Sequence, residues 1–87
     1  MNIDKNNILK NICYAELVFG RINKKLNSNF SKAEIEENIF EVITVTPIDG
    51  FERIGKNYYI SNDDRNIKIS VNSNTFRVIT VDKISKV

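Results

Sequence analysis

The residues best suited to chemistry lie in the second half of the chain, where cationic, tyrosine and hydroxyl side chains alternate with apolar ones. Lys68, Ser70 and Arg77 take polar positions in two alternating segments, and Tyr59 lies in the segment before them. Cations and hydroxyls on one face of a sheet can hold phosphates and stabilise charge that develops on them. A tyrosine ring can stack on a base. The solvated side of an ordinary antiparallel sheet carries the same residue types, so a purely structural role is the competing interpretation.

The residue content disfavours most other kinds of catalytic site. The chain has no histidine, which removes the commonest general base and the commonest metal ligand. Its single cysteine, Cys13, cannot form an internal disulfide, and we expect it to be a small buried side chain. Three isolated glycines do not make a phosphate-binding loop. We therefore expect no metal site and no cofactor, and the content favours a protein without enzymatic activity.

A second candidate surface is acidic. Glu36, Glu37 and Glu41 lie close together in one predicted helix, with Glu34 just before them. They could bind a cation or a basic partner protein. Runs of this kind are more often the solvated face of a helix, and Glu34 fits the third position of a capping box that begins at Ser31. Both interpretations stay open.

Two helices are predicted ahead of the strands. Apolar residues at steps of three and four predict a helix over about 7–27, and the capping box predicts a second over about 31–44. Gly20 interrupts the first helix, and close contact with a neighbouring element is its simplest explanation. The second helix should end before Pro47, because proline and the β-branched residues before it disfavour continuation.

Four strands are predicted at about 51–54, 58–61, 67–72 and 75–81, separated by short polar turns. A two-residue turn at 73–74 would set the pairs of the last hairpin as Val71–Phe76, Ile69–Val78 and Ile67–Thr80. This register gathers one set of polar side chains on the face away from the core, namely Tyr59, Lys68, Ser70 and Arg77. The predicted fold class is α+β, a single domain with two N-terminal helices on one face of a three- to four-stranded antiparallel sheet.

Composition predicts a small cytoplasmic domain. The chain has 87 residues and a net charge of +2, with no apolar run long enough for a membrane span. Its N-terminus lacks the pattern of a signal peptide. Asn, Ile and Lys account for 36 of the 87 residues, and their AT-rich codons favour an origin in a low-GC bacterium or in a phage or plasmid of one.

Four stretches, at 11–18, 21–26, 54–59 and 72–80, resemble the shared blocks of a family of short bacterial proteins known as a domain of unknown function. The first, Asn11-Ile12-Cys13-Tyr14-Ala15-Glu16-Leu17-Val18, is similar to that family's Ile-Cys-Tyr-Thr-Glu-Leu-Val signature. Ala15 stands where the signature has threonine, so a role for that hydroxyl is absent here. The resemblance implies a compact single domain and no particular activity.

The order of elements supports a second comparison. Helices followed by a small antiparallel sheet, with Lys, Arg and Tyr but no His, are similar to RelE-type and barnase-like bacterial ribonuclease toxins. This resemblance implies a metal-independent ribonuclease in which Lys68 and Arg77 stabilise phosphate charge and Tyr59 acts as acid or base. A shared fold alone does not establish a shared function.

Two functions are therefore predicted. The first is a small non-enzymatic binding protein, a regulator or inhibitor from a mobile-element, phage or defence context, that presents a charged surface to a protein or nucleic-acid partner. The alternative is the ribonuclease toxin. An exposed sheet edge also allows a homodimer. The candidate binding residues are Tyr59, Lys68, Ser70, Arg77, Glu36, Glu37 and Glu41.

Overall fold

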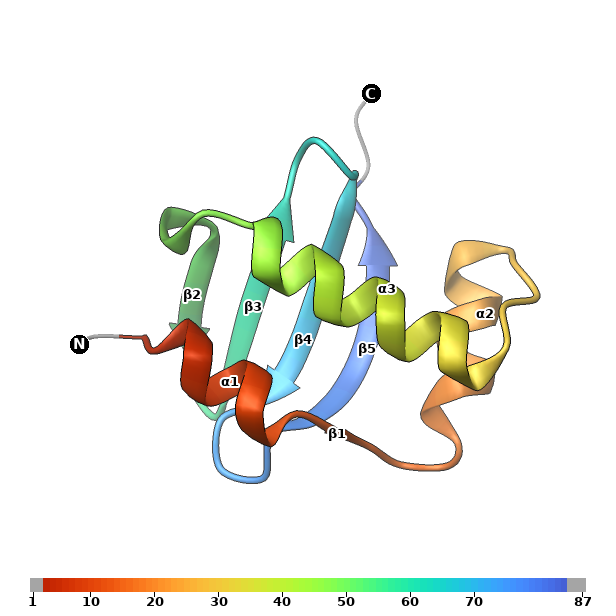
Figure 1. Cartoon of the computed structure of the whole chain (residues 1–87), viewed down its shortest axis with the longest axis horizontal. Helices are drawn as coiled ribbons and strands as arrows, with labels where there is room; N and C mark the ends of the chain where they lie inside the picture. The colour runs from red at the N-terminus through yellow and green to blue at the C-terminus, as the bar shows by residue number, and fades with distance from the viewer. Residues whose placement is uncertain (1–2, 85–87) are drawn as a thin grey trace.

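In the computed structural model, which describes residues 3–84, the fold is α+β, with helices packed on a five-stranded sheet (Figure 1). Figure 1 shows α1 and α3 lying across one face of the sheet and α2 beyond β5. The elements in chain order are α1 (Lys5–Asn11), β1 (Cys13–Tyr14), α2 (Val18–Leu26), α3 (Lys32–Val45), the 3-10 helix η1 (Ile48–Gly50), β2 (Phe51–Ile54), β3 (Asn57–Asn62), β4 (Ile67–Asn72) and β5 (Arg77–Lys83).

The sheet is mixed, which corrects the prediction of a purely antiparallel one. Its strand order is β1-β5-β4-β3-β2, and β1 runs parallel to β5 while the other neighbours are antiparallel. β1 has only two residues, which pair as Cys13 with Arg77 and Tyr14 with Val78. A strand this short leaves no alternating pattern in the sequence, so nothing distinguished it from the helical stripe around it.

The helix predicted over 7–27 is divided into α1 and α2 by this strand. Asp4 caps α1 by accepting a hydrogen bond from the Asn7 amide, and the Cys13 amide then donates to the carbonyl of Phe76 at 2.9 Å. The apolar residues keep a helical spacing across the division because each short helix buries some of them, for example Ile8 in α1 and Ile22 in α2. Periodicity alone therefore could not reveal the division.

The second predicted helix is found as α3. Its capping box is complete: the Glu34 amide donates to Ser31 Oγ at 3.2 Å, and the Ser31 amide donates to Glu34 Oε1 at 2.8 Å. These two bonds lower the pKa of the Glu34 carboxyl. The inward side of α3 is buried against the sheet through Ile35, Ile39, Val42 and Ile43.

The last hairpin has a different register from the predicted one. Val71 pairs with Val78 rather than with Phe76, and Ile69 pairs with Val81. Two features cause the shift. The loop after β4 is longer than two residues, because Asn72 Oδ1 accepts the amides of both Asn74 and Thr75 and the chain turns at Phe76, whose φ is 58°. A bulge in β5 then takes up one further residue, between the pairs Ser70–Thr80 and Val71–Val78.

The core lies between the helices and one face of the sheet. Burial of apolar side chains from α1, α2, α3 and four strands is the main force that holds these layers together. Within residues 3–84, no helix has the length and apolar content needed to cross a membrane. The fully buried large side chains include Ile8, Ile22, Ile35, Ile43, Ile60, Ile69, Val71, Val78 and Val81.

Candidate functional site

The face of the sheet opposite α1 and α3, here called the outer face, carries three of the predicted site residues. Tyr59 pairs with Ser70, and Lys68 lies two pairs further along the same two strands, opposite Ser61. The Lys68 ammonium lies 5.8 Å from the centre of the Tyr59 ring. Asn57 Nδ2 donates to the Tyr59 hydroxyl at 3.2 Å, which fixes the ring from the other side. The predicted grouping of Tyr59, Lys68 and Ser70 on this face is thus present.

Arg77 does not belong to this group, contrary to the predicted register. Lys68 pairs with Asp82 near the end of β5, whereas Arg77 is the first residue of β5 and pairs with Cys13. Five residues separate Arg77 from Asp82, a distance of roughly 16 Å along a strand. The two cations are therefore not neighbours on the sheet. Cys13, predicted to be buried, is exposed because β1 lies at the edge of the sheet.

A groove between α2 and β5 brings together cations that sequence reasoning had not connected. It has a volume of about 710 Å³, and we call it the basic groove. Its α2 side carries Arg21, Lys24 and Lys25, which share one side of the helix because they are spaced three and four residues apart. Its lining residues are Gly20, Arg21, Lys24, Lys25, Ile79 and Thr80.

The position of α2 follows from its opposite, apolar side. Val18, Phe19 and Ile22 are buried, so the cationic side is turned toward solvent beside β5. Asn27 ends α2 in a left-handed conformation, with a φ of 53°. A Cβ at Gly20 would meet nothing within 4 Å, so the predicted close contact at this glycine is wrong, and Gly20 instead leaves the groove open.

Asp82 offsets part of the positive charge of the basic groove. Lys25 Nζ lies 3.0 Å from Asp82 Oδ1, and Asp82 is also the cross-strand partner of Lys68. The Thr80 hydroxyl is buried and has no hydrogen-bond partner among the described residues 3–84. Because the Thr80 hydroxyl is buried, an incoming anion would meet the cations Arg21, Lys24 and Lys25 and not this hydroxyl.

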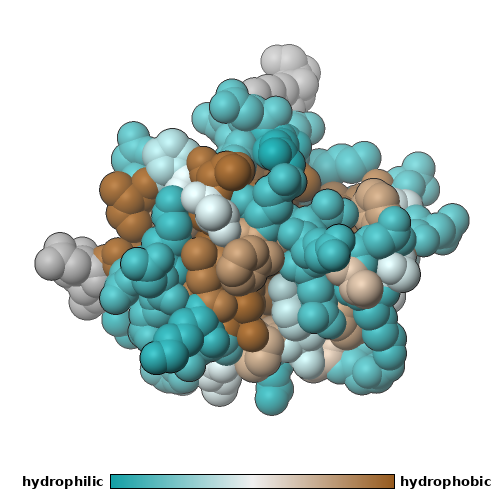
Figure 2. Space-filling view, in the orientation of Figure 1, coloured by the Kyte–Doolittle hydropathy of each residue, from teal (hydrophilic) through white to brown (hydrophobic). Residues whose placement is uncertain are grey.

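The acidic candidates lie on a different side of the molecule. Glu36, Glu37 and Glu41 are exposed on α3, which covers the face of the sheet away from Tyr59. Glu41 already pairs with Arg65 Nη1 at 3.0 Å. Phe40, half-exposed between these acids, had not been predicted as part of the surface. Figure 2, which views this side, shows apolar surface crossing a mostly hydrophilic one.

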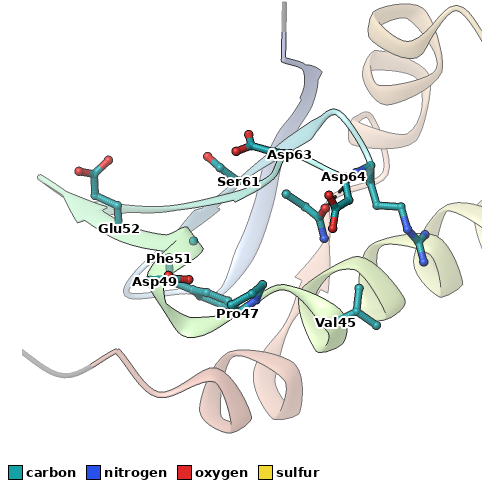
Figure 3. A pocket seen from close by; sticks show the side chains of 11 residues that line it. Val45, Pro47, Asp49, Phe51, Glu52, Ser61, Asp63 and Asp64 are labelled. Carbon is teal, nitrogen blue, oxygen red and sulfur yellow. Dashed lines mark hydrogen bonds between the residues drawn. The ribbon is translucent and has the colours of Figure 1, made fainter. Parts of the chain in front are cut away.

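A second acidic region surrounds a hollow of about 840 Å³ between η1, β2 and the loop after β3 (Figure 3). Asp49, Glu52, Asp63 and Asp64 line it. Figure 3 shows that the carboxylates of Glu52 and Asp63 point away from Pro47 at the base of the hollow. They do not converge, and within residues 3–84 no cluster of three His, Cys, Asp or Glu side chains could hold a metal ion.

The acidic hollow has a rigid wall. Asn62 Nδ2 donates to Thr46 Oγ1 at 3.0 Å, and Asn62 Oδ1 accepts the Arg65 amide at 3.0 Å. Lys5 Nζ donates to the carbonyl of Thr46, which joins α1 to the same network. Thr46 and Asn62 are both buried, and hydrogen bonds offset the cost of removing their polar groups from water. The function of this network is to hold α1, α3 and β3 together.

Fold and site together define a small α+β protein with an open polar sheet face bordered by a cationic groove. Residues 6–82 match the family described as protein of unknown function (DUF3781), and because the match spans most of the chain, the protein belongs to that family. No curated protein and no solved structure matches the chain. The family resemblance seen in the sequence is therefore confirmed, whereas the resemblance to ribonuclease toxins gains no support.

Proposed function

We propose that this protein binds nucleic acid without cleaving it, using the outer face and the basic groove, and acts in the cytoplasm as a regulator or inhibitor. The observation that carries the proposal is the row of Arg21, Lys24 and Lys25 along one groove, with Lys68 nearby on the open sheet. Phosphate contacts from Lys and Arg supply most of the affinity of non-specific nucleic-acid binding.

The charge distribution supports nucleic acid more than a protein partner on this side of the molecule. The cations are arranged along one helix, as contacts to successive phosphates require, rather than dispersed among acids. Asp82 forms an ion pair with one of them, Lys25. At the other edge of the sheet, Glu52 and the acidic hollow repel phosphates, so binding is confined to the α2 side.

The ribonuclease alternative has no comparable support. It requires Lys68, Arg77 and Tyr59 around one phosphate. Arg77 is the first residue of β5, whereas Lys68 pairs with Asp82 near the end of that strand. We accordingly expect that incubation with labelled RNA leaves the RNA intact. Cleavage by the intact protein that is lost in Lys68→Ala would overturn this expectation.

Fluorescence anisotropy with labelled oligonucleotides of mixed sequence, repeated at several salt concentrations, tests the proposal. The logarithm of the binding constant should fall with the logarithm of the salt concentration, with a slope of about −0.7 per phosphate contact for single strands. Three contacts therefore predict a slope of roughly −2. The double variant Arg21→Gln/Lys24→Gln should weaken binding and reduce the slope by roughly 1.4. Lys10→Gln/Lys56→Gln is the matched control, because it removes the same charge from exposed positions in α1 and in the β2–β3 turn.

Two results would refute the proposal. One is the absence of binding at low salt. The other is an equal loss of affinity in both double variants, which would mean that only net charge matters and that the basic groove is not the site.

A further inference from the structure

We infer that the nucleic acid is single-stranded, with its phosphates in the basic groove and a base stacked on Tyr59. This inference rests on the proposed function and specifies the class of its ligand. It comes from one cross-strand row on the outer face. The row runs from β2 to β5 through Glu52, Tyr59, Ser70 and Thr80.

The row places an aromatic ring and the basic groove on either side of Ser70. Thr80 forms part of the groove, and Tyr59 lies two strands away, roughly 10 Å. Ser70 lies between them and is only 5% exposed. Side chains around them cover Ser70 and the Thr80 hydroxyl, so the base is held by the groove and by the Tyr59 ring and not by this strip.

Tyr59 is suited to act as a stacking platform. Its ring is half-buried on the open face, and the hydrogen bond from Asn57 restricts its movement, so little conformational entropy is lost on stacking. The Lys68 ammonium, 5.8 Å from the ring centre, occupies part of the ring surface in the unbound protein. A base that stacks there displaces this ammonium, whose flexible side chain can then contact a phosphate.

The charges on the row set the direction in which the strand lies. Glu52, directly opposite Tyr59 on β2, repels phosphates from that edge, while the α2 cations attract them to the other. The sugar–phosphate backbone therefore follows the groove, and the bases point across the sheet toward β3. A duplex cannot use this arrangement, because its bases are paired inside the helix and it offers only phosphates.

The test compares a labelled single strand with the duplex of the same sequence. Stacking on one aromatic side chain contributes at least about 1 kcal/mol, so Tyr59→Leu should weaken single-strand binding about fivefold or more and leave duplex binding unchanged. Tyr59→Phe keeps the ring and should bind within about twofold of the wild type. Equal affinity of wild type and Tyr59→Leu for the single strand would overturn the inference, as would tighter binding of the duplex.

A second variant keeps the test independent of the stability of Tyr59→Leu. The chain has no tryptophan, so Tyr59→Trp introduces a single fluorescent reporter at the platform. Stacking predicts that the single strand quenches its emission and that the duplex does not. Emission that the bound single strand leaves unchanged would contradict stacking at this position.

The two proposals fail in different ways. If the proposed function is wrong, neither probe binds, or the groove variants bind as tightly as the wild type. If only the present inference is wrong, both probes bind and the Arg21→Gln/Lys24→Gln variant weakens both, while Tyr59→Leu has no effect.

Discussion

Replacing Gly50 by alanine is expected to destabilise the protein by about 2 kcal/mol, within the range for overpacking a tight site. A Cβ at Gly50 would lie 2.6 Å from the backbone oxygen of Ser61 and 2.8 Å from Cγ2 of Thr46. Neither neighbour can move freely. Ser61 belongs to β3, and Thr46 Oγ1 donates a hydrogen bond to the carbonyl of Val42 and accepts one from Asn62 Nδ2. Gly50 does not have a positive φ, so the cost is steric rather than conformational.

Thermal unfolding followed by circular dichroism measures this cost. For a chain of this size, a loss of about 2 kcal/mol lowers Tm by roughly 8–16 °C. Gly20→Ala is the matched control, since the same added Cβ in α2 meets nothing within 4 Å. It should gain up to about 1 kcal/mol from helix propensity and raise Tm. A Gly50→Ala protein that melts at the wild-type temperature would refute the argument that η1 packs tightly against β3.

Three further predictions concern caps, pH and the groove. Ser31→Ala removes the cap of α3 and should lower the free energy of unfolding, measured in urea, by about 1 kcal/mol. The cap also lowers the pKa of the Glu34 carboxyl below 4.5, so the stabilisation by the ionised carboxylate is present above pH 4.5 and is lost as the pH falls through the folded pKa. Glu34→Gln should abolish this pH dependence. Burial raises the pKa of Tyr14 from 10.0 to about 12, so the free energy of unfolding should fall as the pH rises from 10 toward 12. In an ultraviolet titration, Tyr14→Phe should remove the ionisation that occurs at the highest pH. A wild type whose three tyrosines ionise together would contradict this prediction. Asp82→Asn frees Lys25 from its ion pair and should strengthen nucleic-acid binding in the anisotropy assay, and weaker binding would count against the groove.

The sequence predicted those parts of the fold that local signals determine. The capping box at Ser31 and Glu34 located the start of α3, and the strands β2, β3 and β4 lie close to their predicted positions. The break between α1 and α2 could not be predicted in this way. It depends on Cys13 and Tyr14 pairing with β5, a contact between residues more than sixty positions apart in the chain.

The candidate site was predictable to the same extent. Tyr59, Lys68 and Ser70 share a face because they lie on two adjacent strands, at positions that alternate with buried apolar residues. Arg77 was misplaced because two backbone features shift the register of β5, namely the positive φ at Phe76 and the bulge between the pairs Ser70–Thr80 and Val71–Val78. Residue types only weakly indicate either feature. The spacing of Arg21 and Lys24 showed that they share a helix side, but only the fold shows that this side borders the sheet.

The short outer strand β2 has a consequence for self-association. It ends the sheet in the described part of the chain, and its free edge offers backbone groups with which the β2 of a second copy can pair. Two copies joined by antiparallel strands are related by a two-fold axis normal to the sheet, and one residue must then face its own counterpart. In the two registers with most overlap, that residue is Glu52 or Arg53. Like charges directly opposite each other destabilise a strand pair, so β2 disfavours a homodimer formed through its edge and leaves that edge to strands of other sequence.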